Sequence, residues 1–327
     1  MCGTAAMSAA FADCGLRVVA SDELKFPTLH AKARLLGSGE VGNISGEVRS
    51  YRQALELLNA LEPTRGFFWR EYGADGAPQN GGKPRRYFTG RNAGHIDAVR
   101  AKIREWRESG LPPPFCDLLL HDLILAANQV ANIAGTYGYF RSTWNKASLA
   151  PLRLEPTPGP RSSLKHEVLH GSIMDLAPRI EADAFYLDPP YTKRQYGGNY
   201  HILETIAVED EPEPVGAGGL RNWYPQASDF CYRRRARAAF DGALRRMSAP
   251  WVFLSYSEDA HIPPDEMLEL LSDFGNVSRH SIKLDRFRSN GRVAKRGGVE
   301  EHLYVLEMRH DCTAKDDRIV VAEDQGE

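Results

Sequence analysis

One short stretch near the middle of the chain limits the possible folds more than any other. The apolar run "AFYL" at residues 184–187 is followed by Asp188, Pro189, Pro190 and Tyr191. Each proline fixes φ and has no backbone N–H, so a regular strand cannot continue through them. In an open α/β sheet, ligands bind beyond the carboxyl ends of the strands. We therefore expect a buried strand that ends in a rigid turn at a ligand site.

The segments on both sides of this stretch favour an α/β fold. At the start, a helix, an apolar strand and a second helix with glycine stops are expected at residues 5–15, 16–22 and 26–37. After the turn, the pattern predicts helices at 200–207, 230–247 and 263–275, a strand at 250–256, and an antiparallel pair at 276–284 and 301–308.

The stretch between these halves has a different composition. It is rich in Gly, Asn, Arg and aromatic residues, and it ends in the Pro-rich segment "PLRLEPTPGPR". Helices are expected at residues 50–63, 93–110 and 116–135. We interpret residues 38–165 as an inserted, mainly helical domain, residues 1–37 and 166–310 as the domain around it, and residues 311–327 as a weakly ordered acidic tail.

Composition excludes several classes of protein. No apolar run approaches the roughly 20 residues of a membrane helix, and no signal peptide is evident, so we expect a cytoplasmic protein without a membrane partner. Five scattered cysteines, never paired as CxxC, indicate neither a disulfide framework nor a metal site. The formal net charge of -2 gives no global sign of a nucleic-acid partner.

The residues of the turn favour a planar substrate that carries an amino group. The Asp188 carboxylate and the Pro189 carbonyl are two acceptors side by side, and Tyr191 offers a flat aromatic face. An NH₂ that donates to both acceptors becomes a usable nucleophile, because its lone pair is drawn back from the ring.

"DPPY" and its continuation "TKRQYGGNYHILETIA" resemble the adenine-N6 DNA methyltransferases, specifically the Dam-like alpha-arrangement class of restriction-modification systems. The resemblance implies transfer of a methyl group from S-adenosylmethionine to a flipped adenine in double-stranded DNA. It makes Asp188, Pro189 and Tyr191 the catalytic residues. Lys193 and Arg194 would hold DNA phosphates, and Gly197 with Gly198 would let the loop close over the base.

The N-terminus resembles the family's cofactor loop, FxGxG. Met1 stands at the Phe position, Gly3 at the first glycine and Ala5 at the second. The resemblance makes Gly3, Thr4 and Ala5 cofactor-binding residues. About twenty residues on, Asp22 ends the expected strand, at the position from which an acid binds ribose hydroxyls in this architecture.

Two positions depart from the family pattern. Ser172 falls where the family often has an acid near the cofactor adenine. The cofactor loop begins at Met1, so the central strand that precedes it in this fold is expected to be missing. We therefore expect a Rossmann-like methyltransferase sheet without its first strand, and activity that is conditional on that strand. The sequence favours a true start upstream of Met1 over a truncated copy, because the remaining motifs look intact.

The order of motifs implies that residues 38–165 are the target-recognition domain, and a cognate restriction endonuclease is a candidate partner. Three alternatives stay open at this point. They are an inactive, truncated DNA-binding remnant, a methyltransferase for RNA or for cytosine N4, and a nicotinamide-dependent oxidoreductase. The last lacks its GxGxxG fingerprint, because the loop reads "GTAAMS".

Overall fold

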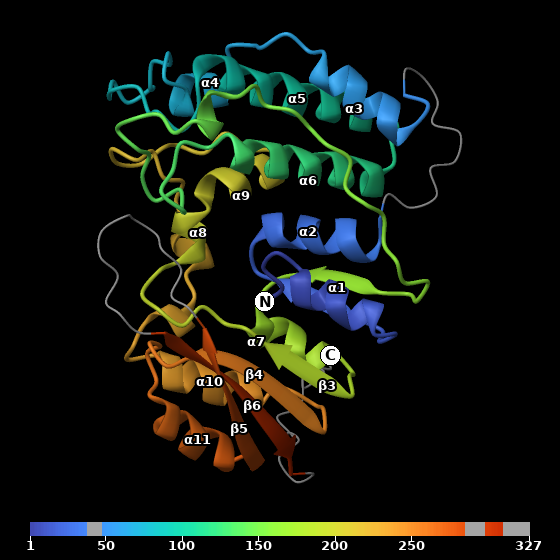
Figure 1. Ribbon diagram of the computed structural model, residues 1–327, viewed down its shortest axis with the longest axis vertical. Coiled ribbons are helices and arrows are strands. Elements are labelled where there is room, and N and C mark those ends of the chain that lie inside the picture. The colour runs from blue at the N-terminus through green and yellow to red at the C-terminus, as the bar shows by residue number, and fades with distance from the viewer. Residues whose placement is uncertain (38–47, 285–297, 310–327) are drawn as a thin grey trace, which may run out of the picture. The chain divides into compact units, whose positions relative to one another are not determined.

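The computed structural model describes residues 1–37, 48–284 and 298–309 (Figure 1). The chain divides into two compact units. Among the described residues, the first unit comprises Met1–Ser172 and Arg194–Ser228, and the second comprises the rest. The fold is mixed α/β, as the sequence predicts.

In the first unit, strands β1 (Val19–Asp22) and β2 (Glu167–His170) pair in parallel. Helices α1 (Ala6–Asp13) and α2 (Lys25–Leu35) pack against each other, and α2 also covers both strands. The opposite side of α2 packs against two further helices, α6 and α9 (Figure 1). Because it has neighbours on both sides, α2 is buried at eight of its eleven positions and carries apolar residues nearly all round.

The other elements of the first unit are helical. They are α3 (Tyr51–Asn59), α4 (Phe67–Tyr72), α5 (Gly90–Glu108), α6 (Pro113–Gln129), η1 (Ala147–Leu149), α8 (Tyr196–Asn199), α9 (His201–Val208) and η3 (Tyr224–Gln226). One apolar cluster runs through α2, α5, α6 and α9, with Leu29, Val99, Leu119 and Ile206 fully buried in it. The helices expected within residues 38–165 therefore share a core with segments that lie far from them in sequence.

The second unit holds a four-stranded sheet in the order β3–β4–β6–β5. Its strands are β3 (Ala184–Leu187), β4 (Trp251–Ser257), β5 (Gly275–Leu284) and β6 (Val299–Met308). Strand β3 runs parallel to β4, whereas β6 is antiparallel to both β4 and β5. The helical elements are α7 (Ile173–Leu176), η2 (Ala177–Arg179), η4 (Asp229–Cys231), α10 (Ala236–Leu244) and α11 (Pro264–Ser272).

The long helix expected at 230–247 is wrong in its first third, because α10 begins only at Ala236. The preceding residues form a short 3₁₀ turn and a second tight turn, in which the Arg235 N–H bonds the Tyr232 carbonyl. These turns let the Phe230 and Phe240 rings meet edge to face, with centroids 4.9 Å apart. In a continuous helix, ten residues would separate the rings by about 15 Å. Strand β2 was not expected at all.

Several finer expectations remain predictions. The two sheets are separate in the described residues, so the Rossmann-like arrangement and the domain boundaries at 38 and 165 are not tested. The acidic tail expected at 311–327 lies outside the described residues. Within the described part of the chain, every helix is too short or too polar to cross a membrane.

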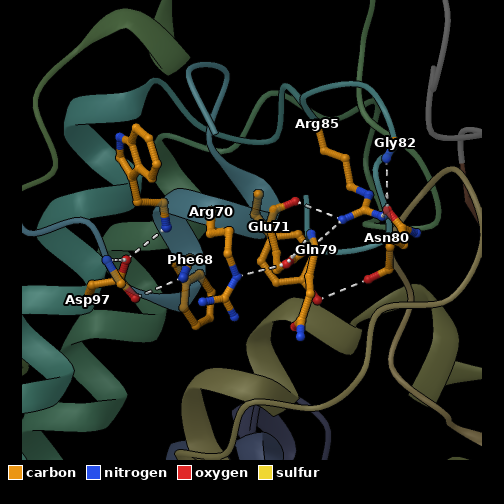
Figure 2. A network of polar contacts seen from close by, with 12 residues as sticks. Phe68, Arg70, Glu71, Gln79, Asn80, Gly82, Arg85 and Asp97 are labelled. Atoms are coloured by element: carbon orange, nitrogen blue, oxygen red, sulfur yellow. Dashed lines mark hydrogen bonds and ion pairs between the residues drawn. The ribbon is translucent and has the colours of Figure 1, made fainter. Parts of the chain in front are cut away.

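A buried ion pair organises the helical part of the first unit. Glu71 on α4 and Arg85 are 0% and 1% exposed, and Arg85 Nη1 lies 2.7 Å from Glu71 Oε2 (Figure 2). Glu71 Oε1 also accepts from Arg70 Nε and from the Gln79 N–H. Arg85 in turn donates to the Ala217 carbonyl. The pair therefore ties α4 to the loop before η3.

Replacing Arg85 with Met should destabilise the protein strongly, because Glu71 Oε2 would remain buried without a donor and only the partly exposed Arg70 would still offset the charge of Glu71. We expect a loss of about 3–5 kcal/mol in the free energy of unfolding, measured by urea titration. The matched control is Arg153→Ala, which removes an exposed ion pair to Glu155 and should cost less than about 1 kcal/mol. Similar losses in the two variants would contradict the structural role of the buried pair.

Candidate active site

The Asp188–Tyr191 turn stands at the carboxyl end of β3, as the sequence predicts. Leu187 pairs with Leu254 of β4, and because the two strands are parallel they end at the same edge of the sheet. The Asp188 side chain is exposed, whereas Pro189 and Pro190 are buried. The prolines fix the backbone, so the carboxylate and the Pro189 carbonyl are presented by a rigid turn.

Tyr191 is held from two sides. Its ring meets Tyr256, on β4, edge to face at a centroid distance of 5.8 Å and an angle of 73°. Its backbone carbonyl accepts a 3.0 Å hydrogen bond from the His261 N–H. Tyr256 is itself 1% exposed. The Tyr191 ring is thus braced in place while the side chain remains partly exposed.

The surroundings of Asp188 disfavour its ionised form. Partial enclosure by protein atoms raises the pKa of the Asp188 carboxyl above its ordinary value, and the nearby Glu301 carboxylate on β6 raises it further. Desolvation disfavours the charged form of a carboxyl group, and a like charge nearby disfavours it further. The acceptor strength of this carboxylate is therefore sensitive to pH.

Lys193 and Arg194 are both exposed, and the chain passes from the second unit to the first between them. The glycines that follow do not form an open loop. Gly197 and Gly198 lie buried in α8, where a Cβ on either would come within 3.1 Å of Trp223 atoms. These glycines allow close packing against Trp223, in place of the freedom to close that we expected from the sequence.

In the first unit, the structure brings Asp22 and the N-terminal loop together. Asp22 Oδ2 accepts the N–H groups of Cys2, at 2.9 Å, and Gly3, at 3.2 Å. Its other oxygen, Oδ1, accepts the N–H of Leu24 at 3.1 Å. A carboxylate has about four acceptor positions, so a ligand hydroxyl can still bind beside these three bonds.

The backbone of the loop is suited to an anionic ligand group. Gly3 and Ala5 both have left-handed conformations, with φ of 51° and 57°, and flank the exposed Thr4 directly before α1. Among the described residues, and apart from its chain neighbours, no atom lies within 4 Å of the position of a Cβ on Gly3, and no side chain caps the N-terminus of α1. A helix N-terminus with free N–H groups favours a carboxylate. These features fit the methionine carboxylate and the ribose of S-adenosylmethionine.

Ser172 lies just after β2, and Gly171 before it has a φ of 151°. It occupies the place of the family's acid, and the contact to the cofactor adenine stays a prediction. Among the described residues, no group of three or more His, Cys, Asp or Glu side chains is arranged to hold a metal ion.

Sequence reasoning missed the residues that support the turn, namely Tyr256, His261 and Glu301. A signal existed for Tyr256, since it ends the expected strand at 250–256 and parallel strands end at one edge. Nothing in the sequence indicated Glu301, because β4 and β6 must first pair in register to place it opposite Ser257.

The comparisons with known proteins agree with this geometry. A family model described as "D12 class N6 adenine-specific DNA methyltransferase" matches residues 2–248. The type II methyltransferase M.NlaIII of Neisseria lactamica is 33% identical over 272 residues, which are 81% of this chain and 79% of that protein. The type II methyltransferase M.FokI of Planomicrobium okeanokoites is 30% identical over 231 residues, which are 70% of this chain and 36% of that protein.

The modification methylase StsI of Streptococcus sanguinis is 26% identical over 299 residues, 89% of this chain and 45% of the relative. The chain thus spans less than half the length of the FokI and StsI enzymes. No solved structure matches. Because the family model covers most of the chain, including the cofactor loop and the Asp188–Tyr191 turn, the chain belongs to the D12 class of N6 adenine-specific DNA methyltransferases, enzymes that take their methyl group from S-adenosylmethionine.

Proposed function

We propose that this protein methylates N6 of adenine at a specific sequence in double-stranded DNA, as the modification enzyme of a restriction-modification system. The observation that carries the proposal is the Asp188–Tyr191 turn. It places an exposed carboxylate beside a rigid carbonyl at a sheet edge, next to a braced aromatic ring.

In the proposed reaction, the flipped adenine stacks on Tyr191, and its amino group donates to the Asp188 carboxylate and to the Pro189 carbonyl. Both bonds draw the lone pair of the amine out of conjugation with the ring, which makes it available to attack an electrophilic methyl group. S-adenosylmethionine supplies an electrophilic methyl on a sulfonium centre. In a direct attack the N–CH₃ bond would form as the S–CH₃ bond breaks, the neutral thioether would leave with the electron pair, and the extra proton of the amine would pass to Asp188 or to solvent. Such a reaction needs neither a metal nor a covalent enzyme intermediate, and Asp188 would stabilise the positive charge that develops on the amine.

The residues proposed to hold the cofactor lie in the first unit. Asp22 would accept the ribose hydroxyls, and the N–H groups of Thr4 and of the first turn of α1 would bind the methionine carboxylate. The three hydrogen bonds that Asp22 already makes fix the loop, and they support this role.

The finer organisation is part of the same proposal. The resemblance supports a Rossmann-like catalytic fold, with residues 38–165 as the target-recognition domain and Lys193 and Arg194 as phosphate contacts. Relatives named as modification methylases support a cognate endonuclease as partner and a cytoplasmic location.

Methylation with labelled S-adenosylmethionine and adenine-containing duplex DNA tests the function, provided the products are digested to nucleosides and identified. We expect N6-methyladenine, and we expect its loss in Asp188→Ala with the circular-dichroism spectrum unchanged. The control Asp183→Ala, an exposed acid just before β3, should keep activity. A labelled cytosine product, label on RNA alone, or DNA binding without methylation would each support one of the alternatives instead.

A second prediction concerns the basic pair after the turn. Replacing Lys193 and Arg194 with Ala should weaken DNA binding and lower the slope of log K against log salt by about 1 for each phosphate that the variant no longer binds. The affinity for S-adenosylmethionine should not change. The control double variant, Arg233→Ala with Arg234→Ala, removes the same charge from an exposed stretch. Equal losses in the two double variants would show that overall charge, and not this pair, binds DNA.

The raised pKa of Asp188 predicts the dependence of kcat/KM on pH. Only the ionised carboxylate is a pure acceptor, so activity should fall as the pH drops through a pKa above the ordinary Asp value of about 3.9. In Glu301→Gln one negative charge is gone, ionisation of Asp188 becomes easier, and the acid limb should move to lower pH. The neighbouring Glu300→Gln serves as control. An acid limb that stays in place would contradict the role of Glu301.

A further inference from the structure

We propose that Glu204, on helix α9, is a positioning residue for the cofactor half of the site. Its carboxylate holds the start of α2 and thereby fixes the orientation of Asp22. The inference rests on the proposed function, since it takes Asp22 as a cofactor ligand. Glu204 lies in the stretch "TKRQYGGNYHILETIA" that carries the family resemblance, but nothing in that stretch indicated a role for this residue.

Glu204 is fully buried, and both of its oxygens bind backbone N–H groups. Oε1 accepts the N–H of Lys25 at 2.9 Å, and Oε2 accepts the N–H of Phe26 at 3.0 Å. A buried carboxylate is retained only where donors satisfy it. Both donors are the first N–H groups of α2, which have no acceptor within their own helix.

The hydrogen bonds of Glu204 continue directly from those of Asp22. Asp22 takes the N–H of Leu24, and Glu204 takes the N–H groups of the next two residues. Leu24 is the N-cap of α2 and has an extended backbone, and its side chain makes no capping bond. Glu204 therefore replaces the missing cap. If its carboxylate were lost, one buried and one partly buried N–H group would lack acceptors, and the turn that orients Asp22 would lose its fixed end.

A third donor completes the surroundings of Glu204. The Gln226 side chain donates to Oε1 at 3.0 Å, so the carboxylate has three hydrogen bonds without a basic side chain among them. The N-terminus of a helix also attracts negative charge. A carboxylate offers acceptors to all three donors, whereas an amide at the same position would have to direct its own N–H₂ towards one of them.

The chain contains a matched control for this arrangement. Asp97, on α5, is buried and accepts the N–H groups of Gly66, Phe68 and Trp69 at the start of α4 (Figure 2). It caps a helix from another helix, as Glu204 does, but α4 carries none of the proposed cofactor residues. If Glu204 had only a structural role, its replacement and that of Asp97 should both lower stability, and neither should change the affinity for the cofactor.

The experiment compares Glu204→Gln with Asp97→Asn in the full-length protein. S-adenosylmethionine binding is measured by calorimetry, and KM is measured separately for the cofactor and for DNA. We expect the cofactor Kd and KM to rise about tenfold in Glu204→Gln, since leaving buried donors without acceptors costs affinity of this order. The KM for DNA should stay within about twofold. Asp97→Asn should lower stability without changing the cofactor Kd.

A second pair of variants tests the same contact without altering the buried carboxylate. Lys25 is the first residue of α2, and the backbone of Leu24 before it is extended, with a ψ of 145°. Proline is tolerated at the first helical position and favours such an extended predecessor. Lys25→Pro therefore removes the N–H with little strain, whereas Lys25→Ala keeps it. We expect the cofactor Kd to rise in Lys25→Pro and to stay near the wild-type value in Lys25→Ala.

Equal cofactor affinity in wild type, Glu204→Gln and Lys25→Pro would overturn the inference. Equal weakening in Asp97→Asn would overturn it too, because it would show a general loss of stability. If the wild-type protein itself does not bind S-adenosylmethionine, the proposed function is wrong and so is the inference. If the wild-type protein binds the cofactor, the variants test the role of Glu204 separately from the proposed function.

Discussion

The first N–H groups of helix α2 must find acceptors inside the protein, and the arrangement of the first unit depends on how they do so. Two carboxylates from distant parts of the chain, Asp22 and Glu204, take three consecutive N–H groups. The helix fixed in this way packs against β1 and β2 on one side and against α6 and α9 on the other. Any shift of its start would be transmitted to all of these neighbours.

Polar bonds also explain why residues 194–228 belong with the helices near the N-terminus. Besides Glu204, two buried tyrosines hold this stretch: Tyr72 donates to the Gly219 carbonyl and Tyr87 to the Gly218 carbonyl. The left-handed φ of 64° at Gly219 and its close approach to Arg85 leave no room for a Cβ. The segment after the Asp188–Tyr191 turn is thus anchored at several points to helices that precede it by more than 100 residues.

The periodicity of apolar residues and the local chemistry of the sequence were sufficient to predict most of the helices and strands and the Asp188–Tyr191 turn. The helical spacing of apolar residues predicted α3, α5, α6 and α11, and the two prolines predicted the end of β3. Strand β2 was missed because "EVLH" has polar ends and only partly buried apolar residues, so no apolar run marks it. The early start predicted for α10 failed because Phe230 has to reach Phe240, which is a tertiary requirement.

The candidate site was predictable where its residues are neighbours in the chain. Asp188, Pro189 and Tyr191 follow one another, and Asp22 stands at a strand end, so motif and spacing located them. Glu204 and Lys25 are 179 residues apart, and a single sequence contains no sign of their hydrogen bond. Which residues support the site depends on which side chains come within hydrogen-bond distance of which backbone groups. That is decided only when the whole unit packs.

Ala5 has a consequence for the loop that is proposed to bind the cofactor. A left-handed alanine costs roughly 1–2 kcal/mol relative to glycine, which adopts this conformation without strain. Ala5 nevertheless holds it while completely enclosed by other residues. The enclosing residues therefore fix the backbone of Ala5 without a ligand, so that binding would cost little conformational entropy at this residue. At Ala5 the loop should therefore have the same backbone conformation in the free and in the bound state.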